Sequence, residues 1–165
     1  MRTKDVFTIP VDADRAGVGQ VVGTYNKAFY FAIFDLTVEQ GAAVDLGALS
    51  SAPLAFLALS FDAKVHCGDW TVIGSVTVSD NIPLPAYKEA VGDPGRIDVV
   101  DHSGKRRRTA TQLEAELLPN RTIVAPIRIE RALRARLGLE PWLEAYSHLE
   151  PSPLTTTDRM FASAP

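Results

Sequence analysis

Short apolar runs separated by turn-forming residues fill the first half of the chain. They span residues 5–10, 19–24, 28–35, 54–61 and 70–78. Because β-branched and aromatic residues prefer strands, while Asp, Asn and Gly prefer the turns between them, this pattern is typical of antiparallel strands. Gly17, Gly19 and Gly23 permit bends and close backbone approach, which a strongly curved sheet needs. The pattern therefore predicts a curved antiparallel sheet, with the nearly all-apolar run 54–61 at its buried centre.

Residues 86–111 carry shorter apolar runs. The runs at 96–101 and 106–111 predict a hairpin closed at 102–105. A strong turn signal, Gly92-Asp93-Pro94-Gly95, precedes it. From Gln112 to Thr122 the pattern fades, and Pro119 breaks any helix there.

Helical periodicity begins only at Pro126, which suits the first turn of a helix. Ile127, Ile129 and Leu133 recur at helical spacing, and Gly138 is a natural end for the helix. A second short helix is expected to begin with residues 141–146. For residues 36–52 the sequence fits either a loop or one short helix.

These elements predict an α+β protein with a curved antiparallel β-sheet, or a partly closed small barrel, and helices gathered near the C-terminus. With 165 residues the chain is long enough for one buried core. We expect a single domain over residues 1–150. Residues 151–165 are rich in Ser, Thr and Pro and are expected to form a flexible tail.

The net charge of −3 conceals an asymmetry along the chain. Residues 1–104 hold 7 Lys+Arg and 13 Asp+Glu, whereas residues 105–165 hold 10 and 7. This division suggests two faces of opposite sign, which affects the choice of partners rather than the fold. The alternative, equally open at this point, is that solvated loops happen to be acidic and one helix basic.

Compartment signals in the sequence are few. Cys67 is the single cysteine, so no intrachain disulfide can form, and a reducing compartment is the simpler interpretation. The first residues contain no apolar segment of the secretory kind. No apolar run has the length of a membrane span, so no membrane association is expected. The expected location is the cytoplasm.

Residues that could form metal-binding, dinucleotide-binding or catalytic motifs lack the spacing or the flanking elements that these motifs require. His66 and Cys67 are adjacent and match no standard zinc spacing. The glycines around Val18 are followed by a strand, whereas a dinucleotide loop is followed by a helix. No Ser, His and Asp set can be assembled from spacing. We therefore expect no metal, no cofactor and no enzyme activity.

Residues of the kinds that bind protein partners tell more about function than the catalytic and metal-binding motifs do. Asp12, Asp14 and Asp35 cluster at predicted turns and could share one rim of the sheet, although Asp is also common in turns for local reasons. Arg107 lies in the basic run 105–108, and Trp142 is of the residue type that anchors protein interfaces. Because the basic run lacks interleaved aromatic residues and the sequence pI is 5.6, direct nucleic-acid binding is not expected.

The order of these segments resembles the immunity protein 26 family, cytoplasmic proteins encoded beside bacterial polymorphic toxins. Most of residues 4–138 take part in the resemblance. The matching stretches are Asp5–Pro10, Gly17–Val21, the aromatic strand that ends at Asp35, Leu54–Phe61, Trp70–Gly74 and Ile129–Leu133. The acidic turn before Gly17 and the Arg-rich hairpin depart from the family pattern, and both are plausible places for partner-specific variation.

The resemblance implies a bacterial immunity protein that binds and neutralises a cognate toxin without catalysis. Asp12, Asp14, Asp35, Arg107 and Trp142 are then the candidate partner-binding residues, and an acidic rim would suit a cationic toxin such as a nuclease. The first alternative is a small-molecule-binding or hydrolytic β-barrel protein. The second, less favoured alternative is a nucleic-acid-binding regulator. The sequence leaves the oligomeric state open.

Overall fold

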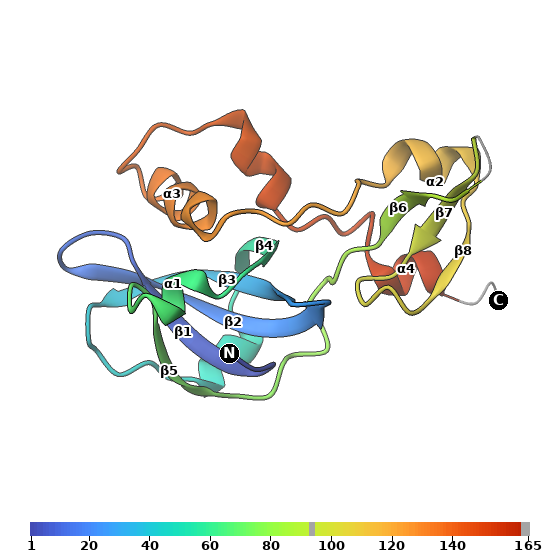
Figure 1. Cartoon of the computed structure of the whole chain (residues 1–165). Helices are drawn as coiled ribbons and strands as arrows, with labels where there is room; N and C mark the ends of the chain where they lie inside the picture. The colour runs from blue at the N-terminus through green and yellow to red at the C-terminus, as the bar shows by residue number, and fades with distance from the viewer. Residues whose placement is uncertain (93–94, 163–165) are drawn as a thin grey trace. The chain divides into compact units, whose positions relative to one another are not determined.

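The computed structural model describes residues 1–92 and 95–162 (Figure 1). The chain forms two compact units. Unit 1 comprises Met1–Ile82 and Ile123–Glu150, and unit 2 comprises Pro83–Thr122 and the residues from Pro151 onward. Each unit is therefore built from two separate stretches of the chain, which alternate along the sequence.

Unit 1 is built on one open antiparallel sheet in the order β4-β3-β2-β1-β5. Its strands are β1 (Asp5–Pro10), β2 (Arg15–Tyr25), β3 (Ala28–Glu39), β4 (Leu54–Ser60) and β5 (Thr71–Ser75). The pairing between neighbours is interrupted at several points, for example between Gly17 and Gly19 of β2. Such interruptions bend a sheet, so the predicted curved antiparallel sheet is confirmed. The partly closed barrel is not formed, because β4 and β5 do not pair with each other in the described residues.

Two details of this sheet differ from the prediction. Residues 36–39 continue β3, and Gly47–Ser51 form a short 3-10 helix, η1. The apolar strand Leu54–Ser60 lies at an edge of the sheet, so its predicted central place is wrong. Its apolar character has another cause: Val124 covers the outer edge, because its backbone N–H donates to Leu59 O at 2.9 Å and Ser60 Oγ donates to Val124 O at 2.7 Å.

Both faces of the sheet are covered. On one face α3 (Pro126–Arg136) inserts Ile129, Ala132 and Leu133 into a core around Phe7. On the other face, residues of the segment that follows β3 pack against Val6, Val18 and Phe34. Apolar strand residues on both faces are therefore required, as the sequence pattern shows.

The ends of α3 follow from its sequence. Pro126 occupies the first turn, and Gly138 follows the helix with φ +75°. The amide of Leu139 donates to Arg134 O, and that of Gly138 donates to Ala135 O, so the predicted glycine end is confirmed. The helical spacing of the apolar residues does not place all of them in the core. Ile127 is 41% exposed, whereas Ile129 is fully buried.

Three further short elements complete unit 1. They are α1 (Ala63–His66), the 3-10 helix η2 (Glu144–Leu149) and the loop of residues 137–143 that precedes η2. The second C-terminal helix therefore exists but begins later than the predicted residue 141 and is a 3-10 helix. No helix among the described residues is long and apolar enough to cross a membrane.

Unit 2 is a small antiparallel sheet in the order β6-β7-β8 with two helices. Its elements are β6 (Tyr87–Ala90), β7 (Ile97–Val100), β8 (Arg107–Thr109), α2 (Gln112–Leu117) and α4 (Thr157–Phe161). The hairpin predicted over 96–111 is confirmed as β7 and β8. The turn predicted at 92–95 includes Asp93 and Pro94, which lie outside the described residues.

Helix α2 was not predicted, although the sequence contains its signal. Thr111 Oγ1 accepts a hydrogen bond from the amide of Glu114, and the Glu114 side chain accepts one from the amide of Thr111. This capping box is the pattern Thr-x-x-Glu, which marks a helix start. Reading that pattern would have placed the helix despite the weak periodicity that follows.

The single domain over residues 1–150 and the flexible tail from residue 151 stay predictions. Residues 151–162 contribute α4 to unit 2, where Thr157 and Met160 are buried. Met160 shares a small apolar core with Ala86, Val99 and Leu118.

Candidate partner-binding site

The structure distributes the five predicted partner residues over both units. Four lie in unit 1: Asp12 and Asp14 in the β1–β2 turn, Asp35 on β3, and Trp142 between α3 and η2. Arg107 lies on β8 of unit 2. Within unit 1, Asp35 and Trp142 are connected through Arg136 and Phe56, neither of which was singled out from the sequence.

Asp12 organises the β1–β2 turn. Its Oδ1 accepts hydrogen bonds from the amides of Asp14 at 3.0 Å and Arg15 at 2.7 Å, and its Oδ2 pairs with the Arg15 guanidinium at 2.6 Å. The hydrogen bond from Arg15 is the main reason why the pKa of Asp12 is lowered. Asp14 has no ion pair with any described residue. Of the two turn aspartates, only Asp14 therefore presents an uncompensated charge.

Asp35 is held by an arginine that is distant in sequence. It lies where the pairing of β3 with β2 is interrupted, between the pairs Gly17–Thr37 and Gly19–Ile33. Arg136, in the last turn of α3, donates from Nε to Asp35 Oδ1 at 2.9 Å and from Nη2 to Oδ2 at 2.7 Å. This bidentate pair lowers the pKa of Asp35 and raises that of Arg136. It joins the curved strand to the end of the helix.

Trp142 rests on buried aromatic rings next to this pair. Its ring centre lies 6.3 Å from that of Phe56, with an interplanar angle of 23°, and 5.6 Å from that of Tyr146 in an edge-on contact. The Arg136 guanidinium carbon lies 6.0 Å from the centre of the Phe56 ring. Phe56 and Tyr146 are buried, whereas Trp142 is 42% exposed. The indole of Trp142 is thus held in place by contacts with these two buried rings, while part of its surface stays exposed to solvent.

Two more apolar side chains near Trp142 in the sequence are exposed. Leu139 is 43% exposed and Leu143 is 53% exposed. We name Leu139, Trp142 and Leu143, with the Asp35–Arg136 pair, the Trp142 surface. A fixed aromatic residue, exposed aliphatic residues close to it in the sequence and an ion pair beside its supporting ring have the composition of a protein-binding surface.

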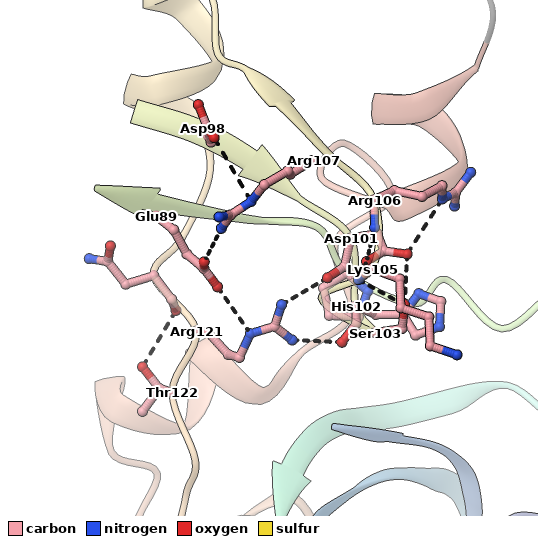
Figure 2. A network of polar contacts seen from close by, with 12 residues as sticks. Glu89, Asp98, Asp101, His102, Ser103, Lys105, Arg106, Arg107, Arg121 and Thr122 are labelled. Atoms are coloured by element: carbon pink, nitrogen blue, oxygen red, sulfur yellow. Dashed lines mark hydrogen bonds and ion pairs between the residues drawn. The ribbon is translucent and has the colours of Figure 1, made fainter. Parts of the chain in front are cut away.

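Arg107 is part of an internal network in unit 2 (Figure 2). Its Nη2 donates to Glu89 Oε2 at 2.7 Å, and its Nε lies 3.9 Å from Asp98 Oδ2. Glu89, Asp98 and Arg107 lie on three neighbouring strands, so these contacts cross the whole sheet. Arg107 therefore stabilises unit 2, and its charge is already compensated there.

Arg121 continues the same network. It donates from Nη1 to His102 O at 2.6 Å and from Nη2 to Asp101 O at 2.8 Å, and its guanidinium carbon lies 4.2 Å from the centre of the Tyr87 ring. Figure 2 shows the side chain directed into the turn between β7 and β8. These contacts lock that turn to the residues that follow α2.

Asp101 closes the β7–β8 turn. Burial alone would raise its pKa, but hydrogen bonds from Ser103 Oγ and from the amide of Arg106, together with other donors of the turn, bring the pKa below the usual value.

The adjacent His102 donates its amide to Thr157 Oγ1 at 3.0 Å, and its Nδ1 lies 3.2 Å from the same oxygen. The hydroxyl in turn donates to Pro85 O at 2.9 Å. His102 therefore connects the turn to α4.

Unit 2 is expected to lose stability as the pH falls below about 6.5, because the pKa of His102 is lowered in the folded protein. Burial is the main cause; Arg106 and Arg121 act in the same direction, while Asp101 and Asp158 oppose it. The unfolded chain binds the proton more readily, so the stabilisation is present above the unfolded pKa and is lost between that value and the lower folded pKa. Unfolding free energies measured from pH 7.5 to 5 test this.

The matched variants are His102→Asn and His148→Asn. His102→Asn should flatten the pH dependence in this range, whereas His148→Asn, at an exposed position of unit 1, should leave it unchanged. An equal slope in the wild type and in His102→Asn would contradict the prediction.

Comparison with known proteins identifies the class to which this open sheet with an exposed aromatic surface belongs. The family model for Immunity protein 26 matches residues 5–93, which is more than half of the chain. The chain therefore belongs to the Immunity protein 26 family, and the predicted relationship is confirmed. No curated protein and no solved structure matches the chain.

Family membership indicates an immunity protein of a toxin system, a class that is generally non-catalytic. The matched segment contains β1–β5 and β6 but ends before α3. Of the Trp142 surface, only Asp35 lies within the matched segment. The match therefore leaves out the second stretch of unit 1, Ile123–Glu150, which includes α3, the loop that follows it and η2.

Proposed function

We propose that this protein binds the toxin of its own toxin system through the Trp142 surface and neutralises it by forming a stoichiometric complex. The observation that carries the proposal is the exposed indole of Trp142, fixed on the buried rings of Phe56 and Tyr146. Because the ring is already held, binding orders few additional side-chain rotamers, and the entropic cost of association is lower.

The charges around the indole also support a protein partner. Asp35 and Arg136 satisfy each other at the margin of the apolar residues, as rim residues of an interface do. In unit 2, Arg106, Arg107 and Arg108 each pair with a carboxylate of the same chain. This internal compensation argues against the basic run 105–108 as a nucleic-acid-binding site, because such a site depends on arginines free to contact phosphate.

The class of toxin is the finer part of the proposal. A nuclease was expected because an acidic rim at Asp12, Asp14 and Asp35 would attract a cationic protein. Two of these carboxylates are paired with arginines, so Asp14 is the residue of the three on which that attraction now depends. We retain the nuclease as the first class to test, and the bacterial cytoplasm as the compartment in which the complex forms.

The direct test is a binding and rescue experiment with the toxin fragment encoded beside this gene. Wild-type protein should form a tight complex with the fragment and restore growth of cells that express it. A toxic fragment that this protein neither binds nor neutralises would overturn the proposed function.

Trp142→Ala is expected to weaken the complex by about 2–4 kcal/mol, roughly 30- to 1,000-fold in Kd, as truncation of a central aromatic residue does. Isothermal titration calorimetry of the variant against the toxin fragment measures this. Val72→Ala is the matched control, because Val72 is 41% exposed on the edge strand β5. Thermal unfolding of both variants separates lost binding from lost folding. Unchanged affinity in a folded Trp142→Ala variant would move the interface elsewhere.

A further inference from the structure

Helix α3 presents a second surface that its packing in unit 1 does not explain. The residues that face the sheet are buried, and the opposite side carries Ile127, Arg128 and Arg131, which we name the outer face of α3. Arg128 and Arg131 are exposed, and neither has an ion pair or a side-chain hydrogen bond with any described residue. Ile127 is 41% exposed beside them.

The other arginines of the same helix behave differently. Arg134 pairs with Glu130 and Glu140, and Arg136 pairs with Asp35. Glu130 is the only acidic residue in α3; it is largely buried and also lies 3.4 Å from Lys64. The carboxylates near the helix are thus already engaged, which leaves the outer face with a positive charge that the described chain does not neutralise.

The position of Arg128 is also unfavourable for the helix itself. It lies in the first turn of α3, where the backbone amides already give the helix a positive end, and no acidic residue is present there. An arginine at this place weakens the helix, and a free acidic side chain would strengthen it. An arginine that destabilises its own helix and makes no compensating contact indicates that position 128 is constrained by function.

More apolar surface lies beside this end of the helix. The bridge between Ser60 and Val124 joins the end of β4 to the segment that leads into α3. Phe61 and Ile123, the residues next to this bridge, are 45% and 42% exposed. Exposed apolar side chains therefore lie next to the bridge that precedes α3, in addition to Ile127 on the outer face itself.

We infer that the outer face of α3 binds an acidic patch on the toxin, with Arg128 and Arg131 pairing with its carboxylates and Ile127 contacting an apolar side chain between them. The inference rests on the proposed function and gives the chemistry of the partner. Guanidinium groups form bidentate pairs with carboxylates, and complementary charge raises the association rate more than it raises the affinity. The toxin surface that this protein covers is therefore acidic at this contact.

The test is the association rate of the toxin fragment with the double variant Arg128→Glu/Arg131→Glu, measured by stopped-flow at low and high salt. We expect the association rate constant to fall by about tenfold or more at low salt and the salt dependence to weaken. The matched control is Lys4→Glu/Lys27→Glu, which changes the net charge equally at exposed residues of unit 1 without described ion pairs. The control should change the rate much less.

Folding provides a second readout. Because glutamate suits the first turn of a helix, the Arg128→Glu change should leave the melting temperature unchanged or raise it. Reduced association in an equally stable protein would support the inference. Equal rates for both double variants, with wild-type binding intact, would overturn the inference alone. Faster association of the Arg128→Glu/Arg131→Glu variant, with slower association of Asp14→Asn, would indicate a toxin surface that is basic at this contact and would overturn the inference. Absence of wild-type binding would overturn the inference together with the proposed function.

Discussion

A chain that ends at Glu150 is expected to lose the folded structure of unit 2 while unit 1 stays folded. The missing residues include α4, which closes the small core of unit 2. Met160 is one of its four buried members, and the removal of a buried Met typically costs about 2–5 kcal/mol. This is a large share of what so small a core can supply.

Polar contacts between residues 151–162 and the rest of unit 2 would be lost as well. The amide of Ala86 donates to Thr155 O at 2.7 Å, and the amide of Thr157 donates to Leu84 O at 2.7 Å. Arg108 donates to Met160 O at 2.7 Å, and the guanidinium groups of Arg106 and Arg108 lie over the Phe161 ring. The basic run of the hairpin therefore has a structural role, because it holds the last helix in place.

Hydrogen exchange followed by mass spectrometry measures the effect on each unit. Peptides covering β7 should lose protection in the shortened chain, whereas peptides covering β3 should keep it. Both tryptophans, Trp70 and Trp142, lie in unit 1, so tryptophan fluorescence should stay native. Full protection of β7 would show that unit 2 folds without α4 and would favour the flexible tail predicted from the sequence.

Point variants within α4 refine this result. Met160→Ala should reduce the protection of β7 substantially. Arg159→Ala, at the exposed neighbouring position, should leave it unchanged. A similar loss in both variants would indicate that helix formation in α4, rather than burial of Met160, supports the unit.

The strands of unit 1 were predictable because their signal is local. Each of β1 to β5 contains a short apolar run that the sequence shows directly, although β2 begins earlier than its run, at Arg15, and β3 continues beyond its run to Glu39. The order of strands in the sheet is set by pairing between distant segments, and no local pattern encodes it. The run 54–60 looks central because Val124, more than sixty residues later, covers its free edge.

The candidate site was predictable only in part for the same reason. Trp142 could be proposed from its residue type, and Asp35 from the turn predicted after it. That turn is wrong, because β3 continues through Asp35 to Glu39. Their connection depends on an ion pair between Asp35 and Arg136, which are 101 positions apart in the sequence. Arg107 was proposed from its place in the basic run 105–108. Its carboxylate partners, Glu89 and Asp98, come from other strands of a sheet whose register the sequence does not reveal.

Gly19→Ala is expected to destabilise unit 1 by about 2–3 kcal/mol, because unit 1 has no room for a methyl group at this place. A Cβ atom on Gly19 would lie 2.6 Å from Phe7 Cζ and 2.9 Å from Ile33 Cδ1. Both side chains are fully buried, and the Phe7 ring is stacked on Trp70 with centres 5.4 Å apart. The ring therefore cannot move away without disturbing the centre of the core. Chemical denaturation followed by tryptophan fluorescence gives the change in unfolding free energy.

A double-mutant cycle identifies the cause. Phe7→Leu removes the ring atoms that the new methyl group would meet, so Gly19→Ala should cost at least 1 kcal/mol less in the Phe7→Leu background, roughly the coupling found between contacting core residues. The control is Gly47→Ala, where the added Cβ would meet only Asp45 Oδ1 at 3.3 Å, and we expect a change within about 0.5 kcal/mol. Strict additivity of Gly19→Ala and Phe7→Leu would refute the steric explanation. The glycine would then act through the backbone, by permitting the interrupted pairing of β2 with β3 that curves the sheet.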